Sequence, residues 1–256
     1  MILRPVITCL LLLSVAYSQR TVVEPTMLGP ALAALGYEGS LNMSTDEARR
    51  LGSAIGCDFF VIGKAEVLSR SGQARELHKE ALLAVMMVDG RTGKLAVFDL
   101  IAEEARSSES AIAAITKALG DRVSGYVDQM TQFRAARESV TNSPIQNSEI
   151  ERIEEMPVEG SLQAVGFKAP EFLGRVKPEY TAEAERADVN ATIEAMVVLR
   201  SSGEVGDVEI TRWAGFGLEE SALRAIRRLQ FKPATRNGKL VSVRAMIRYN
   251  FRRVGQ

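Results

Sequence analysis

The sequence LEESALRAIRRLQFKPA occupies residues 218–234 and carries the clearest structural signals of the chain. It predicts a helix over Leu218–Gln230, because apolar residues recur there at helical spacing and share one face. These residues are Leu218, Ala222, Ala225, Ile226 and Leu229. Pro233 then predicts the end of the helix, since proline cannot continue the hydrogen-bond ladder. We expect the apolar face of this helix to pack on a neighbouring sheet.

Three alternating segments flank this helix and predict strands. They are residues 192–200, 205–213 and 241–251, with turns at 201–204 and 237–239. In the last segment apolar side chains alternate with polar and basic ones, which indicates one buried face and one solvated, basic face. A further short helix precedes the first strand. We therefore expect an α+β chain with two small α/β domains. The C-terminal domain would be a three-stranded antiparallel sheet packed with two helices.

This order and these residues resemble the TonB C-terminal family over residues 165–256. The motifs that carry the resemblance are Pro178-Glu179-Tyr180, Asp207-Val208-Glu209-Ile210, the helix followed by Phe231-Lys232-Pro233-Ala234, and Gly238-Lys239-Leu240-Val241. The chain departs from the family at Thr181, where a second proline is usual. This departure weakens any inference about the short segment that helps to grip a partner.

The resemblance implies a binding function. In the family, a peptide segment of an outer-membrane transporter, the TonB box, pairs with the exposed edge of the last strand, here Ser242–Phe251. An edge strand presents unpaired N–H and C=O groups, which a partner strand satisfies. The partner-binding residues implied are Pro178, Tyr180, Arg244, Met246, Ile247, Arg248, Tyr249 and Asn250. The resemblance also implies that such binding contributes to energy-coupled transmembrane transport.

A second function stays open, because the chain has a globular domain and only 8 prolines where a full TonB has a long proline-rich span. The alternative is an accessory periplasmic interaction or assembly module without energy transduction. Other envelope proteins are further candidate partners. A second copy of the chain, pairing through the edge strand, would give a homodimer.

The last 36 residues are strongly cationic. From Ser221 onward every charged side chain is basic: Arg224, Arg227, Arg228, Lys232, Arg236, Lys239, Arg244, Arg248, Arg252 and Arg253. One interpretation is structural, since the helix arginines complement the helix C-terminus and the strand arginines protect an edge from aggregation. The other is functional, and points to an anionic partner such as an acidic peptide. The chain's own acidic linker is then a candidate competitor.

That linker covers residues 138–164 and separates the C-terminal domain from an N-terminal one at 20–137. From Glu138 to Gly160 it has six acids and one base, and its polar, proline-containing composition favours an exposed connector. In the N-terminal domain Ser44 and Glu47 predict a helix start, and residues 58–67, 81–88 and 94–101 predict strands. A long helix follows from Ser108, with Ile112, Ile115, Leu119, Val123 and Val127 on one face.

Two short motifs in this domain resemble the TolB N-terminal module and the related CsgG-like fold. They are Gly56-Cys57-Asp58 with the apolar run to Gly63, and Val88-Asp89-Gly90-Arg91-Thr92-Gly93. The resemblance implies an α/β fold and an envelope setting.

The first residues resemble an export signal. Arg4 supplies a positive charge, an apolar run follows, and Ala16 and Ser18 suit a cut after Ser18. We expect a signal peptide at residues 1–18 and a periplasmic protein. The alternative is an inner-membrane protein anchored by the uncleaved signal.

Composition argues against several other classes of function. The 32 basic and 32 acidic residues cancel, so net charge gives no reason to expect nucleic acid as a partner. His78 is the only histidine, and Cys57 would be the only cysteine left after cleavage. Neither a zinc cluster nor a catalytic triad is credible with this set. We therefore predict no enzyme activity, no metal and no cofactor.

Overall fold

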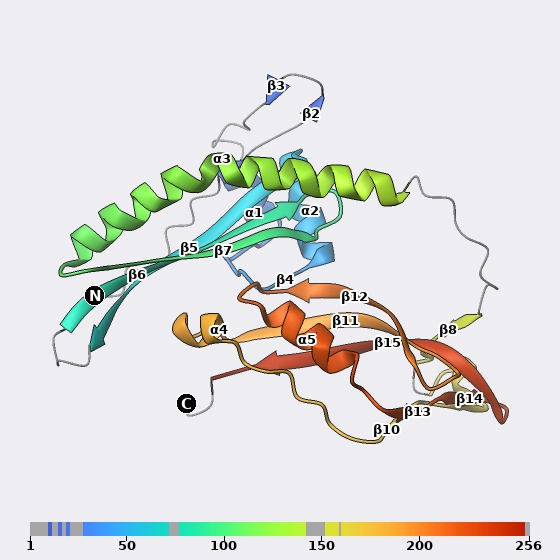
Figure 1. Cartoon of the computed structure of the whole chain (residues 1–256). Coiled ribbons are helices and arrows are strands. Elements are labelled where there is room, and N and C mark those ends of the chain that lie inside the picture. Colours follow the sequence, from blue (N-terminus) through green and yellow to red (C-terminus); the bar gives the residue numbers. More distant parts are fainter. Residues whose placement is uncertain are drawn as a thin grey trace. The chain divides into compact units, whose positions relative to one another are not determined.

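The computed structural model shows a chain of mixed helices and strands (Figure 1). It describes residues 10–11, 15–16, 19–20, 28–71, 77–141, 152–158 and 160–253. Contacts within the chain divide it into two compact units, residues 1–143 and 144–256. Most of the predicted signal peptide, 1–18, lies outside the described residues, and the predicted domain boundaries at 137 and 165 stay predictions.

The first unit contains an antiparallel sheet with the strand order β1-β5-β6-β7. Its strands are β1 (Leu10–Leu11), β5 (Phe59–Ser71), β6 (Leu77–Asp89) and β7 (Leu95–Ala105). Two short strands, β2 (Val15–Ala16) and β3 (Gln19–Arg20), pair separately. The three strands predicted between residues 58 and 101 are thus present.

The turn between β6 and β7 is built by Asp89. Its Oδ1 accepts the backbone N–H of Arg91 at 2.9 Å and of Thr92 at 2.8 Å. Gly93 closes the turn with φ of 70° and donates its N–H to the Asp89 carbonyl at 2.7 Å. These contacts explain physically why the turn sequence carries Asp89 and Gly93.

Helix α2 (Thr45–Ile55) follows strand β4 (Met43–Ser44) and begins as predicted, with Ser44 as N-cap. The Ser44 side chain accepts the Glu47 N–H at 3.2 Å, and the Glu47 carboxylate accepts the Ser44 N–H at 2.7 Å, which completes a capping box. Gly56 ends the helix in the left-handed region with φ of 75°. A further helix, α1 (Leu28–Ala34), precedes it.

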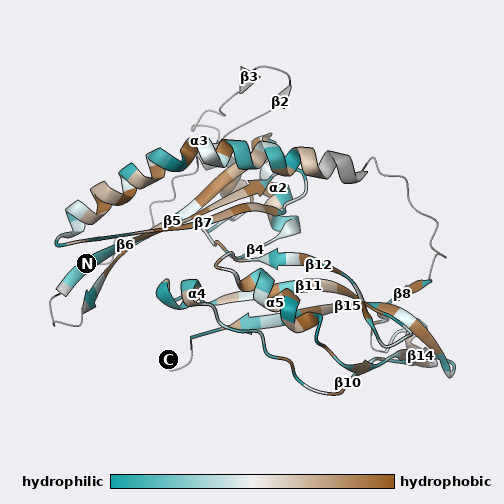
Figure 2. Cartoon of the chain, viewed as in Figure 1, coloured by the Kyte–Doolittle hydropathy of each residue, from teal (hydrophilic) through white to brown (hydrophobic). Residues whose placement is uncertain are grey.

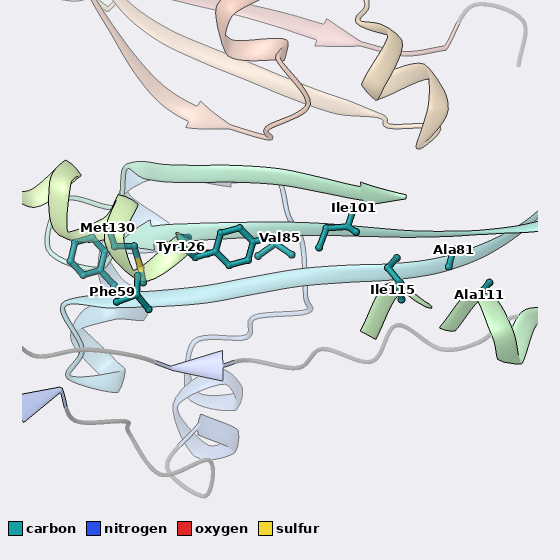
Figure 3. Close-up of a cluster of buried hydrophobic side chains, with 10 residues drawn as sticks. Phe59, Ala81, Val85, Ile101, Ala111, Ile115, Tyr126 and Met130 are labelled. Carbon is teal, nitrogen blue, oxygen red and sulfur yellow. The ribbon is translucent and has the colours of Figure 1, made fainter. Parts of the chain in front are cut away.

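The core of this unit lies between the sheet and the long helix α3 (Ser108–Thr141). Figure 3 shows Phe59, Val85 and Ile101 of the sheet with Ile115, Tyr126 and Met130 of the helix. Ile115 and Val127 are buried as predicted, but Ile112 is 41% exposed. Ala111 takes the buried place instead, because the helix turns that side toward the strands.

The second unit is organised around three long strands: β11 (Ala191–Leu199), β12 (Val205–Trp213) and β15 (Lys239–Phe251). Strand β11 lies between the other two and pairs antiparallel with both. Helix α4 (Ala182–Arg186) precedes β11, and helix α5 (Leu218–Ile226) follows β12. These three strands and two helices match the predicted order, and Figure 2 shows apolar residues along β11 and β15.

The sheet is nevertheless larger than the predicted three-stranded one. Strand β14 (Ala234–Arg236) pairs with β15, and β9 (Phe167–Lys168) pairs with β14, both antiparallel. Strand β8 (Ile153–Glu155) adds to β15 in the parallel direction. The prediction of a purely antiparallel sheet was wrong here, because strands of two or three residues are too short to show a period.

Helix α5 also ends earlier than predicted, at Ile226 rather than Gln230. Arg228 and Leu229 donate to carbonyls only three residues back, which tightens and ends the helix. The chain then enters β13 (Phe231–Lys232), which pairs with β10 (Glu171–Phe172). Lys232 precedes Pro233, and a residue before proline favours extended backbone. A short 3-10 helix, η2 (Leu162–Ala164), lies earlier in this unit.

Candidate functional site

The edge of β15 is divided into two parts. On one side, Val243–Phe251 pairs with β11. On the other, Lys239–Val241 pairs with β14 and Ser242–Arg244 with β8. Within the described part of the chain, residues 245–251 therefore pair on one side alone. We call this stretch, Ala245–Phe251, the free edge. It is shorter than the predicted edge of Ser242–Phe251, since the first three residues already have a partner.

The two faces of the free edge differ as the alternation predicts. Ala245 and Phe251 are buried, and Ile247 and Tyr249 pack partly against the core beneath helix α5. Met246, Arg248 and Asn250 lie on the other face and are exposed, Met246 by 57%. A strand added here would meet side chains of both kinds, apolar on one face and polar on the other.

The exposed face is held in register by polar pairs between strands. The Arg248 guanidinium contacts the Glu194 carboxylate at 2.7 Å, and Arg212 approaches the same carboxylate at 3.5 Å. Thr192 donates its hydroxyl to Asn250 Oδ1 at 2.9 Å. Arg248 and Asn250 therefore support the β11–β15 pairing as well as lining the free edge.

Arg244, also among the predicted partner-binding residues, lies in the occupied part of the edge. Its guanidinium contacts the Glu155 carboxylate at 3.0 Å. Neighbouring Arg236 contacts Glu154 at 2.6 Å and donates to the Gln163 carbonyl at 2.9 Å. The guanidinium of Arg236 also lies 5.1 Å from the ring centre of Phe167. Both carboxylates belong to the acidic linker.

Pro178 and Tyr180 lie in the segment before helix α4. The Tyr180 hydroxyl lies 2.7 Å from the Val189 carbonyl and 3.1 Å from that of Ala184, so it joins α4 to the segment before β11. Burial raises the pKa of Tyr180. The carbonyl of Glu179, which lies between Pro178 and Tyr180 in the sequence, accepts a hydrogen bond from the Ser221 hydroxyl at 2.7 Å. These contacts tie the segment to α4 and α5.

The corner between β12 and α5 depends on Glu219. Its Oε1 accepts the backbone N–H of Ala214 at 2.5 Å and of Gly215 at 2.8 Å. Burial raises the pKa of Glu219, although the two N–H donors oppose the shift. The contact orders a loop in which Phe216 has φ of 58°.

Metal sites, reactive cysteines and membrane spans each place requirements on the described residues. No group of three or more histidine, cysteine or acidic residues there could hold a metal ion. The buried thiol of Cys57 donates to the Gly52 carbonyl at 3.9 Å. Among the described helices, none has both the length and the apolar composition that a membrane span requires.

The sequence analysis named the acidic linker as a candidate competitor, but it did not single out Arg236 or the linker pair Glu154 and Glu155. The signal available was charge alone, a run of acids upstream and a run of bases downstream. Periodicity could not reveal β8, because it has only three residues. The pairing of β8 with β15 can be identified only from the folded structure.

One family model matches the C-terminal part of the chain. The family described as Gram-negative bacterial TonB protein C-terminal matches residues 176–252. Among solved structures, the solution NMR structure of the Pseudomonas aeruginosa TonB C-terminal domain is similar at 19% identity. That match covers 38% of this chain and 96% of the other, with a TM-score of 0.30. No curated protein matches. Residues 176–252 of this chain are thus similar to the TonB C-terminal family.

Proposed function

We propose that this TonB-like envelope protein binds extended peptide segments by adding them as a strand to the free edge, Ala245–Phe251. The observation that carries the proposal is the one-sided pairing of these residues within a TonB C-terminal domain. The partner is the TonB box of an outer-membrane TonB-dependent transporter.

The backbone of the free edge supplies the attraction. Each hydrogen bond formed by an added strand contributes a net stabilisation of about 0.5–1.5 kcal/mol. A ladder along several residues therefore supports binding without a deep pocket. Side chains on the two faces then select the peptide. Ile247 and Tyr249 favour apolar neighbours, and the basic character of Arg244 and Arg252 favours acidic ones.

We further propose that this binding contributes to energy-coupled transmembrane transport. The alternative is an accessory periplasmic module that binds the same kind of peptide without transducing energy. Mass spectrometry of the mature N-terminus separates the two. A mature chain that begins at Gln19 excludes direct attachment to the inner-membrane motor through a membrane helix, and an uncleaved chain favours it.

A pair of proline variants tests the strand addition. In an antiparallel strand, successive residues direct their N–H groups to opposite sides. One of Met246 and Ile247 therefore donates toward β11 and the other toward the free edge. Met246→Pro and Ile247→Pro form a matched pair, because each removes a single N–H from the same strand.

We expect the variant that loses the outward N–H to keep its unfolding temperature, and the other to lose stability. The outward variant should bind at least about tenfold more weakly, since it loses a hydrogen bond and its ring obstructs the added strand. Binding of a fluorescent TonB-box peptide to the full chain is measured by anisotropy, and folding by thermal melting. Unchanged affinity in both folded variants would contradict strand addition at this edge.

A further inference from the structure

The occupied part of the β15 edge already contains an added strand. Strand β8 (Ile153–Glu155) pairs in the parallel direction with Ser242–Arg244, immediately before the free edge begins. It comes from the acidic linker. Figure 1 shows β8 beside β15. The chain thus holds one of its own segments in the arrangement expected of a bound peptide.

Charge complementarity holds this strand in place. Glu154 contacts Arg236 at 2.6 Å, with side chains 17% and 28% exposed respectively. Glu155 contacts Arg244 at 3.0 Å, and both side chains are more exposed. The partly buried Glu154 pair is the stronger of the two, because exposed ion pairs contribute little in water. Arg236 is oriented independently by the Gln163 carbonyl and the Phe167 ring.

Apolar burial contributes little to holding β8. Ile153 and the next apolar residue, Met156, are each 37% exposed, and Val158 is 77% exposed. A three-residue ladder with two ion pairs is a weak attachment compared with the core strands of the same sheet. Strand β8 is therefore suited to leave the edge when a competing strand arrives.

We propose that Arg236, Arg244 and the Ser242–Arg244 edge form an acceptor site for acidic extended segments, and that β8 is its internal, displaceable occupant. The incoming segment carries acidic residues and enters parallel to β15, as β8 does. A peptide long enough to cover both the free edge and Ser242–Arg244 displaces β8. That the displacing peptide is a TonB box rests on the proposed function. The existence of the acceptor site does not rest on it.

Tethering sets the strength of the competition. A segment of the same chain competes at a high effective concentration, about millimolar for a short tether. The apparent affinity for an external strand falls in proportion to the fraction of molecules in which the edge is open. Releasing β8 should therefore tighten the binding of an external acidic strand.

The test uses the full chain and a synthetic peptide of residues 149–157, EIERIEEMP, with a fluorescent label. The double variant Glu154→Lys/Glu155→Lys places positive charge against Arg236 and Arg244 and releases β8. The matched control is Glu149→Lys/Glu159→Lys, which makes the same change of charge in the same linker outside β8. Thermal melting confirms that each variant is folded.

We expect the released variant to bind the peptide about tenfold more tightly than the unmodified chain and the control variant do. A peptide in which Glu154 and Glu155 are both changed to lysine should not bind. Hydrogen exchange at the amides of Ser242–Arg244 should be faster in the released variant. Equal affinity of the folded released variant and the unmodified chain, or no binding by either, would overturn the acceptor site.

A second probe, a TonB-box peptide, separates the two proposals. If it binds the released variant more tightly than the unmodified chain, displacement of β8 is supported. If it binds both equally, displacement is overturned while the proposed function stands. If it binds neither, and the linker peptide still binds the released variant, the proposed function fails and the acceptor site is supported.

Discussion

Single residues in the second unit combine structural and binding roles. Arg248 holds Glu194 at the centre of the sheet while its backbone lies on the free edge. Tyr180, predicted as a partner-binding residue, is committed to the carbonyls around α4 and β11. Arg236 was not among the predicted partner-binding residues, yet it contacts the linker through Glu154 and Gln163. The residue type suggested a contact in each case, and the neighbours determined which contact formed.

Glu219 gives a pH-dependent prediction at this scale. Burial raises its pKa in the folded chain, so the folded state binds a proton more readily than the unfolded state does. The free energy of unfolding should therefore fall as pH rises from the ordinary carboxyl pKa through the raised one. Glu219→Gln removes this titration and keeps an acceptor for Ala214 and Gly215.

We expect the stability of the unmodified chain relative to Glu219→Gln to decrease as pH rises above the ordinary carboxyl pKa of about 4.3 and through the raised pKa of Glu219. Glu219→Ala, which removes the acceptor, should cost about 1–3 kcal/mol at all pH values because two amides lose their partner. Urea unfolding across the pH range measures both effects. A constant difference between the chain and Glu219→Gln would show that Glu219 does not titrate differently on folding.

At the scale of elements, long segments follow the sequence pattern and short ones follow their neighbours. Strands β11, β12 and β15 lie within two residues of the predicted bounds, because alternation over nine or more residues is a strong signal. Strands β8, β9 and β14 have two or three residues each and depend on the edge that they join. Helix α5 ends early because its last predicted turn is extended into β13.

The β6–β7 turn allows an element-scale prediction about glycine. A Cβ added to Gly93 would lie within 1.8 Å of the Thr45 carbonyl oxygen, at the start of α2. A Cβ at Gly56, which has a similar positive φ, would meet nothing within 4 Å. Gly56→Ala should therefore cost about 1–2 kcal/mol, from backbone strain alone.

Gly93→Ala should cost more, about 3 kcal/mol or above, because the turn must also move away from α2. Chemical denaturation of both variants measures the difference. Equal costs would mean that the close approach of the turn to α2 does not restrict residue 93.

At the scale of the molecule, the candidate site lies within the second of the two units. Every contact described for the free edge, the acceptor site and β8 lies within residues 144–256. The resemblance of the first unit to the TolB N-terminal and CsgG-like modules stays a prediction. The proposals for peptide binding do not depend on it.

A fragment of residues 144–256 should therefore bind the TonB-box peptide with an affinity within about threefold of the full chain, since every residue proposed to contact the peptide lies in this fragment. Anisotropy with both proteins checks this, after circular dichroism has shown that the fragment is folded. A loss greater than about tenfold in the folded fragment would assign part of the binding site to the first unit.

The amino-acid sequence alone determined the α+β character, the three long strands, the two flanking helices and the family that the C-terminal part resembles. These depend on periodicity and on turn residues, which are local properties of the chain. Only the tertiary structure decided which part of the β15 edge is free. That depends on Ile153–Glu155 meeting Ser242–Arg244, about ninety residues away, through a pairing that no local pattern records. The physical reason is that strand edges select partners by backbone complementarity, and any extended segment can supply it.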